Sequence, residues 1–471
     1  MKQNFLSDQR FWKNALKLAF PVAVQNMLTS SFTLVDTLLV SMLGDVTLAA
    51  VGMAGQWSWL MNMIFFGTCS ATGVFVAQYW GVKDKARIHK TLGIALSITL
   101  SISALFFCLS FFAPHAVLHM FNKNADVIRE GSDYLKILSF CFPALAISNV
   151  FSIVLRSTER PGLPMYVSVA TTATNIFLDY AMILGKFGFP ALGVKGAALA
   201  TVIAGWLGVV LIVAVSLFEK NILISSFRRV FGYGLSDIKV FFNRAIPVIA
   251  NETLWGGGTF VFNLIYANMG YEYYASITIL KTFENLSYVL FIGLCSACSV
   301  MIGKSVGMGD IKRGIEDSKR FLLIIPIAAV IIGAVSVIFR SQLVSVFDMG
   351  NNISELTMET ARWLIIIYSV ELPVRTLGFT FVVGILRSGG DTLTAAKMDL
   401  GSLWLCSLPA TLLAAYVFKL PFLVCYIVMF LAEDYIKIIL CARYYKTRKW
   451  IKPVTAEGKQ ALKDFTEKSD D

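Results

Sequence analysis

Charged residues are scarce in this chain, and two long stretches contain none. Asp, Glu, Lys and Arg make up 15% of the residues, whereas a soluble globular chain carries about 25%. Residues 46–82 and 91–122 contain no charge, and a helix that spans a bilayer needs about 20 apolar residues. The alternating segments of a membrane β-barrel are also absent. This composition predicts an all-α polytopic membrane protein.

Several chemical motifs are absent as well. The sequence has no Gly-x-x-x-x-Gly-Lys-Ser/Thr run, so it lacks the usual ATP-binding loop. No catalytic histidine, Ser–Lys or metal set is visible in the apolar segments, which disfavours an intramembrane enzyme. His115 and His119 lack a Glu or Cys companion and indicate a solvated helix end, and the cysteines are interpreted as packing residues. We therefore expect no cofactor, and no metal apart from a coupling ion.

The formal charge of +11 is compatible with a nucleic-acid surface, but the positions of the basic residues favour a membrane explanation. Of the 41 Lys and Arg residues, 31 fall on one side of the expected spans and 8 on the other, while Lys281 and Arg375 fall within spans. Positive charge collects on the cytoplasmic side of membrane proteins. The pattern predicts a multi-pass protein of the cytoplasmic membrane with both termini inside and no nucleic-acid partner.

The first half of the sequence returns in the second half. Landmarks recur 226 positions later, with Pro21 as Pro247, Gly67 as Gly293 and Asp84 as Asp310. Leu155-Arg156-Ser157 returns at an offset of 231 as Leu386-Arg387-Ser388. Many secondary transporters are built from such repeats, with the substrate path between them. The repeat disfavours a passive channel without excluding it.

Each half is expected to contain six spans, and an even number gives both halves the same orientation. The spans are expected at about 14–42, 46–80, 91–114, 132–156, 162–185 and 194–218, and at about 241–269, 272–304, 318–340, 358–386, 392–418 and 421–445. The predicted fold is twelve transmembrane helices in two six-helix lobes related by the internal repeat. The predicted domains are an N-terminal lobe at 1–218, a cytoplasmic linker at 219–240, a C-terminal lobe at 241–446 and a polar cytoplasmic tail at 447–471, which we expect to be mobile after Lys452.

Six short motifs carry a family resemblance. They are Phe32-Thr33-Leu34-Val35-Asp36 followed by Leu43-Gly44, Gln78-Tyr79-Trp80-Gly81, Leu155-Arg156-Ser157, Asn175-Ile176-Phe177-Leu178-Asp179, Gly196-Ala197-Ala198-Leu199-Ala200-Thr201 and Leu386-Arg387-Ser388-Gly389-Gly390-Asp391-Thr392. In this order and spacing, over about residues 10 to 450, the chain resembles the MATE (multidrug and toxic compound extrusion) family. That resemblance implies an efflux antiporter with twelve helices in two lobes, driven by inward H⁺ or Na⁺.

Two carboxylates stand inside apolar spans of the first half. Carboxylates at such depth are costly and usually face a cavity or a partner, as we expect for Asp36 and Asp179. Asn175 lies four residues before Asp179 and shares its helix face. In the family, the positions similar to Asp36, Asn175, Asp179 and Thr201 bind the coupling ion, so the resemblance implies an H⁺ or Na⁺ site here. Thr201 bonding only to its own helix is an equal alternative.

The second half carries in-span charges of its own. Lys281 and Glu284 are three residues apart and Glu371 and Arg375 four apart, so each pair can meet on one helix face. Mutual neutralisation and a role in ion or substrate binding are equal alternatives. Some family members place an ion-binding Glu where Glu252 stands, but Thr376 occupies the place of their further Asp. That departure weakens a second Na⁺ site.

The predicted function is a secondary active multidrug efflux antiporter. It exports organic, cationic compounds in exchange for H⁺ or Na⁺, with the lipid bilayer and small organic substrates as its partners, and it functions as a monomer. Gln56, Trp57, Asn62 and Phe66 are candidate cavity-lining residues, because aromatics with a few amides suit a broad amphipathic substrate. The alternative is a flippase for lipid-linked saccharides. A flippase would need a strongly cationic cavity, whereas Glu252, Glu284 and Glu371 match the two in-span cations.

Overall fold

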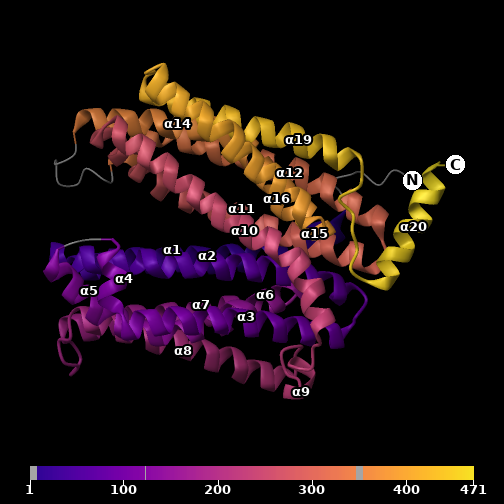
Figure 1. The fold of residues 1–471 in the computed structure, drawn as a ribbon, viewed down its shortest axis with the longest axis horizontal. Coiled ribbons are helices and arrows are strands. Elements are labelled where there is room, and N and C mark those ends of the chain that lie inside the picture. The colour runs from indigo at the N-terminus through magenta and orange to yellow at the C-terminus, as the bar shows by residue number, and fades with distance from the viewer. Residues whose placement is uncertain (1–7, 122–123, 346–353, 471) are drawn as a thin grey trace. The chain divides into compact units, whose positions relative to one another are not determined.

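A computed structural model describes residues 8–121, 124–345 and 354–470, and all regular elements in these ranges are helical (Figure 1). The first half contains α1 (Gln9–Ser41), α2 (Asp45–Gly81), α3 (Lys85–Phe112), α4 (Pro114–His119), α5 (Ala125–Leu138), η1 (Ser139–Cys141), α6 (Phe142–Ser157), α7 (Gly162–Leu184), α8 (Val194–Glu219) and α9 (Phe227–Val230). The second half begins with α10 (Leu235–Met269), α11 (Tyr271–Met308), α12 (Ile311–Ile338), α13 (Arg340–Ser345), α14 (Glu355–Phe379), η3 (Thr380–Leu386) and α15 (Arg387–Gly389). It ends with α16 (Thr392–Gly401), η4 (Ser402–Ser407), α17 (Leu408–Leu412), η5 (Leu413–Val417), α18 (Phe422–Phe430), η6 (Leu431–Tyr435), α19 (Ile436–Lys446) and α20 (Ala456–Asp470).

Ten helical segments of the described residues are long and apolar enough to cross a membrane. They are Gln9–Val40, Val46–Gly81, Lys85–Phe112, Ala125–Ser157, Gly162–Leu184, Val194–Glu219, Glu272–Met308, Ile311–Ile338, Glu355–Gly389 and Thr392–Val417. The predicted spans at 241–269 and 421–445 are not among them, although both are helical. The first lies within α10, and the second is divided by the π-helical turn η6 between α18 and α19. The multi-pass helical class is confirmed, while the number twelve stays a prediction.

The chain divides into two compact units. The N-terminal unit comprises Val24–Val76 and Asp84–Ala245, and the C-terminal unit comprises the start of α1 up to Ala23, Ala77–Lys83 and everything from Ile246 onward. The units therefore differ from the predicted lobes at the beginning of the chain. There Asp8 pairs with Arg320 at 2.9 Å and Phe11 packs edge-on against Phe321.

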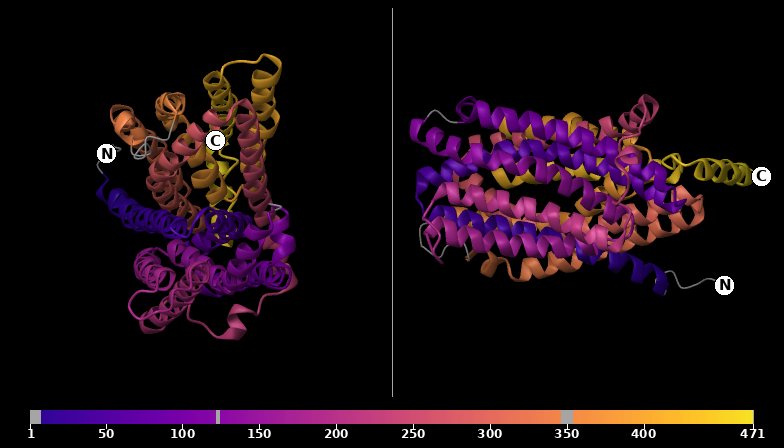
Figure 2. Two further views of the ribbon diagram at one scale, coloured as in Figure 1. Left: turned by 90° about the vertical axis from the view of Figure 1, so that its left-hand side faces the viewer. Right: turned by 90° about the horizontal axis from the view of Figure 1, so that it is seen from below.

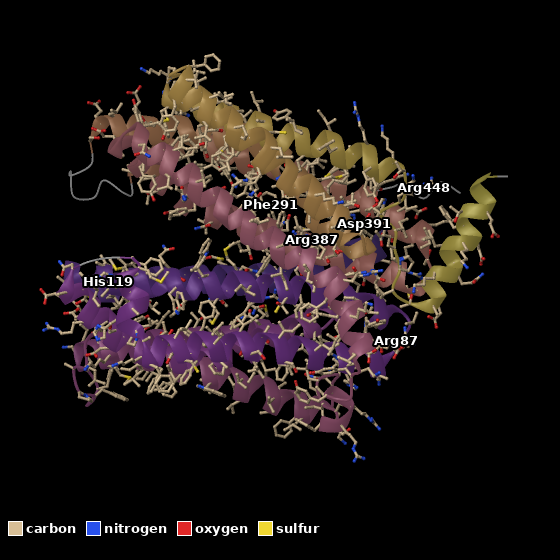
Figure 3. All side chains as sticks on the ribbon, in the orientation of Figure 1. Arg87, His119, Phe291, Arg387, Asp391 and Arg448 are labelled. Carbon is tan, nitrogen blue, oxygen red and sulfur yellow. The ribbon has the colours of Figure 1, made fainter. Side chains whose placement is uncertain are left out.

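Small residues allow the helices of the N-terminal unit to approach closely. A Cβ atom on Gly196 of α8 would lie 2.7 Å from the backbone oxygen of Met182 in α7. One on Gly205 would lie 2.6 Å from Cys141 Sγ. Helices in membranes associate mainly through such close packing. Figure 3 labels Arg87 near the start of α3 and His119 at the end of α4, at opposite ends of this unit.

The segment after α19 is folded onto the C-terminal unit, so the prediction of a mobile tail is wrong. The Trp450 side chain is fully buried, its ring stacks on Tyr445, and a Cβ atom on Gly389 would lie 2.3 Å from it. The backbone N–H of Lys452 donates to Gly389 O at 2.7 Å. Helix α20 then packs against α11 and α12, and Figure 2 shows it at one end of the C-terminal unit. The polar composition hid this docking because the contacts come from few apolar residues and from the backbone.

Two buried polar side chains fix this C-terminal segment. Gln78 donates through Nε2 to Ser388 O at 3.0 Å and accepts through Oε1 from the Val454 N–H at 2.7 Å. Asp391 caps α16 and pairs with Lys452 Nζ at 2.8 Å. Burial alone would raise the pKa of Asp391, but the hydrogen bonds from Lys452, Tyr444 and Thr394 outweigh it and hold the pKa below its usual value. Figure 3 labels Asp391 and Arg387 at the two sides of this turn.

Candidate functional site

The four predicted ion-site residues of the N-terminal unit include two that are fully buried, Asn175 and Asp179, on one face of α7. In the orientation that satisfies both atoms of its amide, Asn175 Nδ2 donates to Asp179 Oδ2 at 2.5 Å and Oδ1 accepts from the Thr201 N–H at 3.2 Å. The half-buried Asp36 of α1 lies near enough to Asp179 for the two carboxylates to repel each other. The structure thus brings the four residues together.

The Thr201 hydroxyl is bonded to its own helix, which is the alternative interpretation of this residue. It donates to Ala197 O one helical turn earlier at 3.0 Å. Its backbone N–H, rather than its hydroxyl, is the group that meets Asn175. The contribution of Thr201 that the structure shows is therefore to orient the amide beside Asp179.

The two carboxylates are chemically unsatisfied. One oxygen of each, Oδ1 of Asp36 and Oδ1 of Asp179, is buried and has no hydrogen-bond partner among the described residues. Two negative charges close together in a weakly polar medium are costly unless a proton or a cation lies between or on them. The arrangement can therefore hold an exchangeable H⁺ or a small cation.

A cavity of about 230 Å³ within the N-terminal unit reaches this site. Asn175 and Thr201 form part of its wall, and most of its other polar groups are hydroxyls and one amide, from Thr29, Ser148, Ser152, Ser168, Thr171, Thr172 and Gln25. Gln25 also accepts a hydrogen bond from Arg156. Asn175, which lines the cavity, is hydrogen-bonded to Asp179. An ion bound by the carboxylates and a ligand in the cavity can therefore influence each other.

The in-span charges of the C-terminal unit form different pairs from those predicted. Arg375 of α14 pairs with Glu284 of α11 at 2.6 Å. Lys281 donates to Asn263 Oδ1 at 2.6 Å, and the Tyr435 hydroxyl donates to Glu371 at 3.4 Å. Neither pair suggested by spacing, Lys281 with Glu284 or Glu371 with Arg375, forms an ion pair among the described residues, although Glu284 still attracts Lys281. Spacing along one helix allowed them, but α11 packs directly on α14 and offers closer partners.

Glu252 is committed to a structural partner. Its carboxylate pairs with the buried Arg387 at 2.6 Å. Arg156, the repeat counterpart of Arg387, meets the neutral Gln25 instead. The extra charge of Glu252 thus compensates a buried guanidinium, which lowers its availability as an ion ligand.

The family comparison decides which class of protein this is. A model of the family described as MatE matches residues 21–181 and again residues 247–413. The chain belongs to the MatE family. The two matches start at Pro21 and Pro247, the first landmark pair of the repeat.

Relatives of this MatE chain span its whole length. It is 24% identical over 448 residues to the probable multidrug resistance protein NorM of Thermotoga maritima, covering 93% of each chain. It is 24% identical over 451 residues to the uncharacterized transporter YisQ of Bacillus subtilis, covering 94% of this chain and 96% of that protein.

Solved structures share the MatE fold. A MOP superfamily transporter from Pyrococcus furiosus superposes with a TM-score of 0.84 at 17% identity, covering 93% of this chain and 96% of that chain. A mutant of the Vibrio cholerae MATE transporter VcmN gives a TM-score of 0.81 at 17% identity, covering 97% and 98%. These likenesses concern the fold alone.

The candidate cavity-lining residues of α2 do not line the cavity of about 230 Å³ in the N-terminal unit of this MatE chain or the one of about 80 Å³ in its C-terminal unit. Trp57 is buried in the core, where its Nε1 donates to Ser110 Oγ at 2.9 Å. Gln56, Asn62 and Phe66 lie on an exposed face of the helix, and Asn62 bonds to the backbone of Ser58. Trp57 is therefore a packing residue, while the lining role of the three exposed residues stays a prediction.

The sequence interpretation missed a cluster of buried charges in the C-terminal unit of this MatE chain. Asp399, Glu433 and Asp434 surround Lys437, all four with little exposed side-chain area. The signal was present in the sequence, because the carboxylates Asp399, Glu433 and Asp434 stand inside the predicted spans 392–418 and 421–445.

Proposed function

We propose that this MatE chain is a secondary active efflux transporter that exports organic cations in exchange for an inward flow of H⁺ or Na⁺. The observation that carries the proposal is the unsatisfied pair Asp36 and Asp179, held by Asn175 beside a cavity within the N-terminal unit. The names of the NorM relatives as probable multidrug resistance proteins support an efflux function. A transporter also accounts for the chain better than an enzyme does.

Coupling follows from the charge of the pair. With a proton or Na⁺ bound, the pair loses its attraction for a cationic ligand in the neighbouring cavity. With the ion released, the negative charge returns and favours the cation. Because the coupling free energy is reciprocal, a bound organic cation must lower the affinity for the ion by the same factor. One charge moving through about 100 mV supplies roughly 2.3 kcal/mol, enough for about a fifty-fold concentration ratio.

The flippase alternative receives less support from the C-terminal unit. A pyrophosphate-linked lipid would favour a strongly cationic cavity, but Arg375 is paired with Glu284 and Arg387 with Glu252. The cavity near these residues also contains Glu433 and Asp434. The balance of charge there suits a cationic or neutral ligand better than a pyrophosphate.

Proteoliposomes separate the two coupling ions. We expect efflux of a cationic dye under an imposed pH gradient alone or under an Na⁺ gradient alone, and no efflux without either. Empty liposomes under the same gradients serve as the control. Efflux that proceeds at the same rate with neither gradient would refute secondary active transport.

We further propose that the protein lies in the cytoplasmic membrane with both termini inside, as the 31-to-8 distribution of basic residues suggests. Lys459 on the exposed face of α20 offers a position for a test. A Lys459→Cys variant is expected to react with an impermeant thiol reagent only in permeabilised cells. Labelling of that thiol from outside intact cells would contradict the orientation.

A further inference from the structure

Three carboxylates of the C-terminal unit converge on one ammonium group. Lys437 Nζ lies 2.9 Å from Asp399 Oδ1, 3.0 Å from Glu433 Oε1 and 3.5 Å from Asp434 Oδ1. The exposed fractions of the four side chains range from 4% for Asp434 to 14% for Glu433. Lys437 therefore lies where a free cation bound by these carboxylates would have to lie.

The local backbone builds this arrangement. Glu433 and Asp434 lie on η6, and a π-helical turn within α-helices often marks a functional site. Lys437 follows one turn later, so it faces both. Asp399 comes from α16. Gly378 of α14 allows the lysine to pass, because a Cβ atom there would lie 3.3 Å from Lys437 Cδ.

The cluster has too little positive charge. Three carboxylates share one ammonium, which leaves two formal negative charges in a buried position, and buried charge is costly unless it is compensated. Arg387 attracts Asp399 and Arg375 attracts Glu433 from the neighbouring elements, but each of these arginines is already paired with another carboxylate. The other charged groups around the cluster also have their own partners. These are Glu252 with Arg387, Glu284 with Arg375, Lys281 with Asn263, and Glu371 with Tyr435.

An unsatisfied acceptor lies beside the carboxylates. The fully buried Asn251 donates from Nδ2 to Asp399 Oδ2 at 2.9 Å, but its Oδ1 has no donor among the residues that the structure describes. A buried acceptor without a donor costs about 1–3 kcal/mol. Protons carried by the cluster would supply positive charge and hydrogen-bond donors where both are short.

A cavity beside this cluster offers space for a ligand. Glu433 and Asp434 form part of the wall of a space of about 80 Å³ within the C-terminal unit. The remaining wall is rich in aromatic rings, contributed by Trp255, Phe262, Tyr266, Tyr426 and Phe430. Aromatic faces next to carboxylates suit an organic cation. A cation in this space would lie next to these two carboxylates.

We propose that Asp399, Glu433, Asp434 and Lys437 form a second proton-exchange site, from which an organic cation entering the aromatic cavity displaces protons. Lys437 is the built-in cation of this site, so Na⁺ is excluded from it. The inference rests on the proposed efflux of organic cations but concerns a different unit from the Asp36–Asp179 pair.

Calorimetry of the purified full chain tests the proposal. Asp36→Asn and Asp179→Asn are combined as a background that silences the N-terminal site. N-methylpyridinium is titrated in buffers of different ionisation enthalpy, which reports the protons released per cation bound. We expect release on this background, and a fall to about a tenth or less when Glu433→Gln and Asp434→Asn are added. Toluene, a neutral isostere, should release none.

A matched variant and a salt comparison complete the test. Glu371→Gln removes a buried carboxylate of the same unit that does not contact Lys437, and it should leave proton release unchanged. Glu433→Gln alone replaces the double change if thermal unfolding shows that the double variant is not folded. The proposal is overturned if the background binds the cation without releasing protons, if it binds no cation, or if release persists in the variant. It is also overturned if NaCl weakens binding more than KCl does at equal ionic strength.

These outcomes are separable from the proposed function. Proton release is measured at equilibrium on protein that lacks the N-terminal carboxylates. Failure of gradient-driven efflux in proteoliposomes would refute transport and leave the binding result standing. Absence of proton release on the background that lacks only the N-terminal carboxylates would refute the second site alone.

Discussion

An Asp179→Asn variant is expected to reduce gradient-driven efflux of an organic cation to the rate of empty liposomes. The amide keeps the size of the side chain and can still accept the hydrogen bond from Asn175, so the packing of α7 should survive. It cannot gain or lose a charge when a proton or Na⁺ binds. The same loss is expected for Asp36→Asn, because one carboxylate without the other has no repulsion to relieve.

The matched control is Asp133→Asn in the same unit. Asp133 is half-exposed and pairs with Lys195 at 3.0 Å, and an exposed pair of this kind contributes little to stability. Efflux by this variant should equal that of the wild type. Normal efflux by Asp36→Asn or by Asp179→Asn, in protein shown to insert and fold, would remove that residue from the coupling site.

A Trp450→Ala variant is expected to lower the free energy of unfolding of the C-terminal unit by about 3–5 kcal/mol. The indole is fully buried, stacks on Tyr445 and donates from Nε1 to Tyr445 O at 3.2 Å. Its removal leaves a cavity against Gly389 and loosens the segment that Gln78 and Asp391 hold. The variant should therefore melt at a clearly lower temperature.

A thiol-reactive dye provides the measurement, because Cys295 and Cys441 of the same unit are buried until it unfolds. Trp363→Ala is the control, since that side chain of α14 is 51% exposed and should contribute little. Equal melting temperatures for the two variants would show that the segment after α19 does not stabilise the unit.

The sequence indicated the residues proposed for the N-terminal site because their relations are local or unusual. Asn175 and Asp179 are four residues apart, which places them on one face of α7 whatever the tertiary structure. Asp36 stands out as a carboxylate in an apolar span. Their convergence came from the family resemblance, since periodicity does not tell which faces of α1 and α7 meet.

The contacts of the charged residues in the C-terminal unit could not be predicted from their spacing along the sequence. Spacing along α11 suggested that Glu284 pairs with Lys281. In the structure Glu284 pairs with Arg375, which comes from the neighbouring helix α14. Only the fold shows that Asp399, distant in sequence, lies 2.9 Å from the ammonium of Lys437.

The docked tail was missed for a related reason. Composition describes residues 447–471 as polar, and polar segments of this kind often stay unfolded. The segment is held by one buried indole and by backbone hydrogen bonds to Gly389 and Gln78. Such contacts leave almost no trace in the hydropathy of the sequence.

The central claim is that movement of an organic cation is tied to movement of an ion. The most direct measurement loads proteoliposomes with a pH-sensitive dye and Na⁺-free buffer and then applies only a gradient of the organic cation. The account predicts that the cation drives H⁺ in the opposite direction and changes the internal pH, or drives Na⁺ when that ion is supplied and a sodium-sensitive dye is used. Both responses should vanish in Asp36→Asn and Asp179→Asn. Transport of the cation with no movement of either ion would contradict the account.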